Sequence, residues 1–295
     1  MAEINDKFEF EQDGKTYSLY DLPDGFVIEG RVNLSCKGLT ELPDLSKVIV
    51  KGDFNCSFNI LTSLKGAPQE IGGDFRCAFN KLTSLEGAPQ KVVGDFYCND
   101  NRLISLEGAP QKTGRGFHCN DNLLTTLAGA PKDVNEGFGC QNNQLTTLEG
   151  APQEIGGSFL CSHNKLATLK GAPQKVAGDF SCRENELISL EGAPQEVGGD
   201  FYCGSNPNLT SLLVLPKMPE NKQIYCDDEL KEKYKNDGLL NLVVYYKDVI
   251  ASAKYQSELS AYKIRQRKKE ENKTAQAQFK AGYAAFKKKQ SEERE

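Results

Sequence analysis

The residues of this chain best able to do chemistry are cysteines, and eight of the ten recur every 21 residues. The recurring ones are Cys56, Cys77, Cys98, Cys119, Cys140, Cys161, Cys182 and Cys203. Stacked repeats would hold these thiols in a straight row about 4.8 Å apart. A disulfide needs Cβ atoms about 3.5–4.5 Å apart, and a metal ion needs ligands that converge on one point. We therefore predict reduced thiols that fill a core as small apolar groups, in a reducing, cytoplasmic compartment.

The two histidines, His118 and His163, are the other residues suited to acid–base chemistry. His118 precedes Cys119, but neighbours on a strand face opposite sides, so they cannot act together as base and nucleophile. The chain also lacks a P-loop, a G-x-G-x-x-G fingerprint and a paired-acid motif. We predict no catalytic residue, no metal site and no cofactor, and therefore a protein that is not an enzyme.

A tandem repeat positions the cysteines, and it reads G-D-F-x-C-x-x-N-x-L-T-S-L-x-G-A-P-Q plus a short apolar link. Phe and Cys alternate, so they share one face of a strand, and one strand per repeat is expected to stack in parallel. Stacking buries rows of Phe, Cys and Leu that a single repeat could not bury alone. The Asn after each cysteine can satisfy backbone groups at the bend. Proline in the G-A-P run predicts a non-helical return side.

This repeat resembles a leucine-rich repeat, because F-x-C-x-x-N-x-L follows the spacing L-x-L-x-x-N/C-x-L. Over about residues 26–226 it is similar to the short repeats of secreted bacterial effectors and to arrays encoded by bacteriophages and gut bacteria. The resemblance implies a β-solenoid with parallel strands on its concave face and a role in protein–protein recognition. It names no partner, because fold does not fix function.

The ends of the array depart from the repeat, as solenoid ends do when they cover a core. Residues 1–30 are expected to form an N-terminal hairpin cap, because two alternating segments flank Asp13-Gly14. Residues 31–226 are expected to form a solenoid of about nine 21-residue coils. Residues 227–295 are rich in Ala, Lys, Glu and Gln and predict a C-terminal helical region.

The C-terminal region has an apolar face at helical spacing, formed by Leu239, Leu242, Tyr246, Val249 and Ala253. Three interpretations stay open for the rest of it. It could be an exposed helix, a helix that binds a partner or makes a homo-oligomer, or a contact with nucleic acid or an anionic surface. Acidic residues interrupt its basic runs, which weighs against the last.

Three positions beside each cysteine vary from repeat to repeat while the rest of the unit is constant. We expect their side chains to point away from the core, onto the exposed strand surface. Aromatic and arginine residues on such a surface are typical interface anchors. The partner-binding candidates are Phe58, Arg76, Phe79, Tyr97, His118, Leu160, Arg183 and Tyr202. Neutral drift at solvated positions is the alternative explanation.

The overall charge of −5 combines an acidic body, which disfavours nucleic acid as a partner, with a basic C-terminal region. No apolar stretch approaches the roughly 20 residues of a membrane helix, and no secretory signal is visible. The sequence thus predicts a phage or bacterial protein-binding module that blocks or redirects a host enzyme or a defence protein. The alternative is a structural protein that oligomerises through its C-terminal helix.

Overall fold

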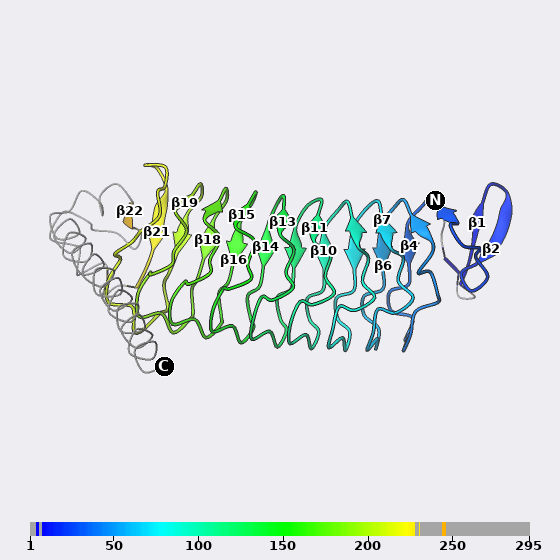
Figure 1. Cartoon of the computed structure of the whole chain (residues 1–295), viewed down its shortest axis with the longest axis horizontal. Helices are drawn as coiled ribbons and strands as arrows, with labels where there is room; N and C mark the ends of the chain where they lie inside the picture. Colours follow the sequence, from blue (N-terminus) through cyan, green and yellow to red (C-terminus); the bar gives the residue numbers. More distant parts are fainter. Residues whose placement is uncertain (1–3, 6–7, 228–229, 231–243, 246–295) are drawn as a thin grey trace, which may run out of the picture.

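Each repeat forms one coil of a β-solenoid, and each coil contributes a short strand to each of two parallel sheets (Figure 1). The computed structural model describes residues 4–5, 8–227, 230 and 244–245. Equivalent strands lie in register from coil to coil, so that Phe96 pairs with Phe75 on one side and Phe117 on the other. The prediction of a parallel solenoid with about nine coils is confirmed.

The first sheet carries the Phe of each repeat, which points inward, and the following residue, which points outward. Its strands are, in spatial order, β4 (Val32–Asn33), β6 (Phe54–Asn55), β8 (Phe75–Arg76), β10 (Phe96–Tyr97), β12 (Phe117–His118), β14 (Phe138–Gly139), β16 (Phe159–Leu160), β18 (Phe180–Ser181), β20 (Phe201–Tyr202), β21 (Gln223–Tyr225) and β22 (Val244–Tyr245). All pairs up to β21 are parallel, because each coil advances the chain by one strand spacing.

The second sheet is formed by the apolar link, which the sequence analysis did not recognise as a strand. Its strands are β3 (Val27–Ile28), β5 (Ile49–Val50), β7 (Glu70–Ile71), β9 (Lys91–Val92), β11 (Lys112–Thr113), β13 (Asp133–Val134), β15 (Glu154–Ile155), β17 (Lys175–Val176) and β19 (Glu196–Val197). The expectation of one strand per repeat is therefore wrong. Two strands form because most links pair a charged residue, which faces water, with an apolar residue, which is buried.

The core between the two sheets consists of continuous rows of identical side chains. Rings of neighbouring coils from Phe54 to Phe201 lie 5.1–5.7 Å apart between centroids, and these phenylalanines are no more than 1% exposed. The eight repeating cysteines are fully buried beside them. Because burying one Phe contributes roughly 1.5–3 kcal/mol, these rows supply much of the stability.

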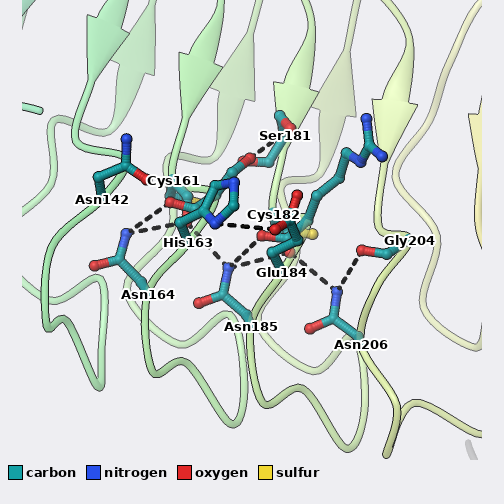
Figure 2. Close-up of polar contacts among 12 residues, drawn as sticks. Asn142, Cys161, His163, Asn164, Ser181, Cys182, Glu184, Asn185, Gly204 and Asn206 are labelled. Atoms are coloured by element: carbon teal, nitrogen blue, oxygen red, sulfur yellow. Dashed lines mark hydrogen bonds and ion pairs between the residues drawn. The ribbon is translucent and has the colours of Figure 1, made fainter.

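The chain leaves the first sheet at an asparagine whose amide joins neighbouring coils. Asn164 donates through Nδ2 to the carbonyl oxygens of Cys140 and Cys161, each at 3.1 Å, and of Ser162 at 3.2 Å. Its Oδ1 accepts the backbone N–H of Leu145 at 3.0 Å. Figure 2 shows the donated bonds at successive coils. Between residues 27 and 227, all of which the structure describes, no helix occurs, which confirms the non-helical return side.

One position of the link alternates between glycine and a larger residue along the array. The column reads Lys51, Gly72, Val93, Gly114, Asn135, Gly156, Ala177, Gly198 and Pro219. A Cβ on Gly114 would overlap the carbonyl oxygen of Val93, and a Cβ on Gly156 would overlap that of Asn135. In the coil after each larger residue, this link position therefore lies too close to the backbone of the preceding coil to carry a Cβ atom.

The N-terminal end of the described chain is a β-hairpin, as the sequence predicts. Strands β1 (Glu9–Gln12) and β2 (Lys15–Ser18) pair antiparallel around Asp13-Gly14, and both turn residues have positive φ, which suits a type I′ turn. The Gln12 amide donates to the carbonyl of Val27 and accepts the N–H of Glu29, both at 3.0 Å. This side chain therefore takes the place of a further strand at the edge of the second sheet.

At the other end, β22 pairs antiparallel with β21 and closes the edge of the first sheet. Helix was expected throughout residues 227–295, and at Val244–Tyr245 this is wrong. The free edge of β21 offers backbone partners, and valine and tyrosine favour strands. The other predicted helical positions, Leu239 to Ala253 and beyond, lie outside the described residues. Among the residues described, no helix is long and apolar enough to cross a membrane.

We predict that Asn122→Ala lowers the free energy of unfolding by about 2–4 kcal/mol. Asn122 is buried, donates to the carbonyls of Cys98 and Cys119 and accepts the N–H of Leu103, so its loss strands several buried backbone groups. Urea denaturation measures the change. The matched control is Asn135→Ala, since this exposed asparagine donates to a single carbonyl and should cost less than about 1 kcal/mol. Equal losses of unfolding free energy in the two variants would contradict the structural role of Asn122 at the corner.

Candidate functional site

The outward side of the first sheet, here called the strand face, carries the residues that vary between coils. In the third full repeat Phe96 and Cys98 are buried, while Asp95, Tyr97 and Asn99 alternate with them and are partly exposed. The strand face therefore consists of three columns: the residue before Phe, the residue between Phe and Cys, and the residue after Cys. Parallel in-register pairing places equivalent side chains next to one another along each column.

Three predicted residues form a continuous stack of planar groups on this face. The Tyr97 and His118 rings are parallel to within 10°, with centroids 4.6 Å apart. On the other side of Tyr97, the Arg76 guanidinium lies 5.4 Å from the ring centroid, within cation–π range. Arg76 also forms an ion pair with Asp74 at 2.6 Å. These contacts fix the three side chains, so the face presents a rigid planar surface.

Burial, together with the carboxylates next to this stack, shifts the pKa values of its two rings. Asp95 lies 3.8 Å from Nε2 of His118. Burial lowers the pKa of His118 below its usual value, and the Asp95 charge opposes this only in part. Burial, followed by the charges of Asp95 and Asp74, raises the pKa of Tyr97. Both rings are consequently neutral at neutral pH.

A second stack lies at the C-terminal end of the strand face and includes a residue that the sequence analysis missed. The rings of Tyr202 and Tyr225 are parallel to within 9°, with centroids 4.5 Å apart. Tyr225 belongs to β21 and pairs directly with Tyr202. Its place between Ile224 and Cys226 in the degenerate last coil was the available signal, because those two residues occupy the Phe and Cys positions.

Phe58 and Phe79 lie beyond the ends of their strands, at the corner, and not in the strand columns as predicted. Both have left-handed backbones, with φ of 57° and 54°. Their rings stack 4.3 Å apart and nearly parallel, and Phe58 and Phe79 are 55% and 43% exposed. The same corner position in later coils carries Asp100, Asp121 and Asn142, residue types that tolerate this conformation better. These two phenylalanines therefore combine an unfavourable backbone with an exposed apolar surface.

The remaining two predicted residues stand apart from these groups. Leu160 is partly buried on β16, and Arg183 is exposed one residue after Cys182. Thus the structure brings the eight candidates into a corner pair, an Arg–Tyr–His stack and a tyrosine stack, with Leu160 and Arg183 in the coils between them. A column of carboxylates, including Asp53 and Asp200, shares the strand face and was not among the candidates.

The eight repeating cysteines form no disulfide, which confirms the prediction of reduced thiols for that row. Burial raises the pKa of Cys56 to about 12 and likewise raises the pKa of Cys140 and Cys182. A protonated thiol is a poor nucleophile and metal ligand. Among the described residues no group of three or more His, Cys, Asp or Glu could hold a metal ion. Cys36, which lies off the cysteine row, is exposed.

Comparison with known proteins gives little beyond the fold described above. No family model matches this chain, and no curated protein matches it. Among solved structures it is similar to YopM from Yersinia enterocolitica WA-314, with 23% sequence identity and a TM-score of 0.46. The aligned region covers 67% of this chain and 46% of YopM, so the chain matches less than half the length of that protein.

We predict that a thiol reagent such as 5,5′-dithiobis(2-nitrobenzoate) modifies one cysteine rapidly in the native protein. That residue is Cys36, because the other nine thiols are buried. Denaturation in urea should raise the reactive thiols to the ten that the sequence contains. The control is Cys36→Ser, which should abolish the rapid phase. Several rapid thiols in the native protein would mean that the cysteine row is open to solvent.

We also predict that the double variant Phe58→Asn/Phe79→Asn is more stable than the parent by about 0.5–1.5 kcal/mol. Each left-handed phenylalanine costs about 1 kcal/mol, which asparagine largely removes. The single lost ring stack contributes only about 0.5–1.5 kcal/mol. Urea denaturation checks the sign, with Phe58→Val/Phe79→Val as the comparison that should destabilise. A large loss of stability in the asparagine variant would show that the ring pair serves the fold.

Proposed function

We propose that this chain is a protein-binding module and that the strand face, with its adjacent corner, holds the partner. The observation that carries this proposal is the stacked pair of Phe58 and Phe79. Left-handed backbone and exposed rings both cost stability, and three later coils carry Asp or Asn at the same position. Strain kept at an exposed aromatic pair is typical of an interface anchor.

The planar stacks on the strand face support the same surface. Ring contacts and ion pairs within the chain hold Arg76, Tyr97 and His118 in place in the absence of a partner. A pre-ordered side chain loses little conformational freedom on binding, so its contacts contribute more fully to affinity. Tyr202 and Tyr225 offer a second rigid surface at the far end of the array.

The repeat itself indicates the class of partner. Its resemblance to leucine-rich repeats of secreted effectors and phage-encoded arrays favours a bacterial or phage interaction protein. A host enzyme or a defence protein, blocked or redirected by occlusion, is the partner class that we propose. Oligomerisation through the C-terminal region is the alternative, and most residues of that region lie outside the described part of the chain.

Affinity capture from bacterial lysate, with captured proteins identified by mass spectrometry, tests this function. We expect a defined partner that is lost with Tyr97→Ala/Tyr202→Ala and with Phe58→Asn/Phe79→Asn, because each pair removes an anchor. The matched control is Ile104→Asn/Ile188→Asn. These isoleucines are 60% and 58% exposed but lie away from both sheets, so the partner should remain bound.

Two outcomes would overturn the proposal. One is capture that none of the strand-face variants changes. The other is a protein that captures nothing while light scattering shows an oligomer that disappears when residues 238–295 are removed. The second outcome would favour a structural role instead.

A further inference from the structure

In the coil that contains β14, two of the three columns of the strand face have no side chain. Gly137 and Gly139 occupy the columns that elsewhere carry aspartates and the planar stack. We call this pair the glycine step. Gly116, in the preceding coil, also replaces an aspartate. The step adjoins His118, the last ring of the Arg–Tyr–His stack.

The fold does not require glycine at the step. Neither residue has a positive φ. A Cβ on Gly137 would meet only the Ser158 carbonyl oxygen, at 3.5 Å. A Cβ on Gly139 would lie 3.1 Å from Oε1 of Gln141, the end of a flexible side chain, whereas a Cβ on Gly114 would overlap backbone. Glycine within a strand is unfavourable for stability, and it often marks the close approach of a ligand.

Three polar atoms surround the position that a Gly139 side chain would take. Besides Gln141 Oε1 they are His118 Nδ1, at 3.5 Å, and Asn120 Oδ1, at 3.8 Å. Gln141 Oε1 is buried and has no hydrogen-bond partner among the described residues. The Asp95 carboxylate beside Nε2 of His118 favours a proton on that nitrogen, which leaves Nδ1 as an acceptor. The step therefore gathers three acceptors and lacks a donor.

The charge of the surrounding surface matches a cationic donor. In the eight full repeats, the strand face and its corner column carry eight carboxylates against two arginines. The carboxylates are those of Asp53, Asp74, Asp95, Asp100, Asp121, Asp179, Glu184 and Asp200. Arg76 is already paired with Asp74 and Asp53. An excess of negative charge steers and holds basic segments.

The geometry favours arginine over lysine. Tyr97 covers one face of the His118 ring, and the strand order places the glycine step beyond the other face. A guanidinium is planar, so it can extend the stack and donate several N–H groups in its own plane. An ammonium group can donate but cannot stack.

We propose that the strand face binds a basic segment of its protein partner, with one arginine seated at the glycine step on His118 and hydrogen-bonded to Gln141 and Asn120. This inference rests on the protein-binding function proposed above and specifies the chemistry of the partner. The apolar corner of Phe58 and Phe79 then serves as a separate anchor, three coils away.

Fluorescence anisotropy with synthetic peptides tests the proposal on the full chain. The probe is a labelled peptide with three arginines separated by Gly-Ser pairs, and its counterparts carry lysine or neutral citrulline. We expect the arginine peptide to bind more tightly than the lysine peptide, with no measurable binding of citrulline. Gly139→Val, which fills the step, should weaken arginine-peptide binding about tenfold or more. Gln141→Glu should tighten it several-fold by adding a charge.

The matched control is Asn55→Val, which places the same side chain in the same column at β6, next to Arg76 and four coils away from the step. It should leave peptide binding unchanged, and urea midpoints verify that every variant folds. Equal binding of the arginine and citrulline peptides, or unchanged binding by both Gly139→Val and Gln141→Glu, would overturn the inference. If lysate capture still depends on Phe58 and Phe79 in that case, the protein-binding function stands and only the arginine site fails.

Discussion

The amide of the corner asparagine is the contact on which the remaining structure depends. At Asn122 it ties the carbonyl oxygens of Cys98 and Cys119 to one nitrogen and holds the N–H of Leu103 with its oxygen. The bond partners belong to adjacent coils, so each corner is shared and none can shift alone. Because the corner fixes where the strand ends, it also fixes which side chains enter the core and which face outward.

This shared corner explains why the strand face can carry unfavourable features without unfolding. The rows of Phe, Cys and Leu repeat in every coil, so stability is distributed along the array and does not depend on any outward residue. Phe58 and Phe79 can then remain left-handed, and Gly139 can leave a strand without a side chain, at a cost that the neighbouring coils offset. Such separation of a constant scaffold from a variable surface is what allows repeat proteins to bind diverse partners.

Much of the fold follows from the sequence because a 21-residue period fixes both register and burial. The hairpin around Asp13-Gly14 was predicted for the same kind of local reason. The second sheet was missed because each of its strands has two residues and leaves one inward side chain as its signal. The tail prediction relied on helix propensity, which the free edge of β21 overrides at Val244–Tyr245.

The sequence predicts which columns of residues form the candidate surface. It does not predict the contacts that their side chains make between neighbouring coils. Whether Tyr97 stacks on His118 or turns away depends on side-chain rotamers and on the neighbouring coil, which composition does not determine. The corner position of Phe58 and Phe79 had a usable signal, since Asp and Asn recur in that column and favour left-handed backbone. The glycines of the step can be read from the sequence as a gap in the columns. That Oε1 of Gln141 lacks a hydrogen-bond partner is visible only in the structure.

The alternation of glycine with larger residues in the link has a consequence for how such an array can change length. A coil ending in Val93 must be followed by one ending in glycine, as Gly114 is, because a second side chain there would collide with backbone. Duplicating a coil with a larger link residue, or deleting a coil with a glycine link, would bring two larger residues together, whereas copying an adjacent pair preserves the order. Copying two coils at a time is therefore the change of length that keeps every glycine next to a larger residue, and this unit is twice the period of the repeat.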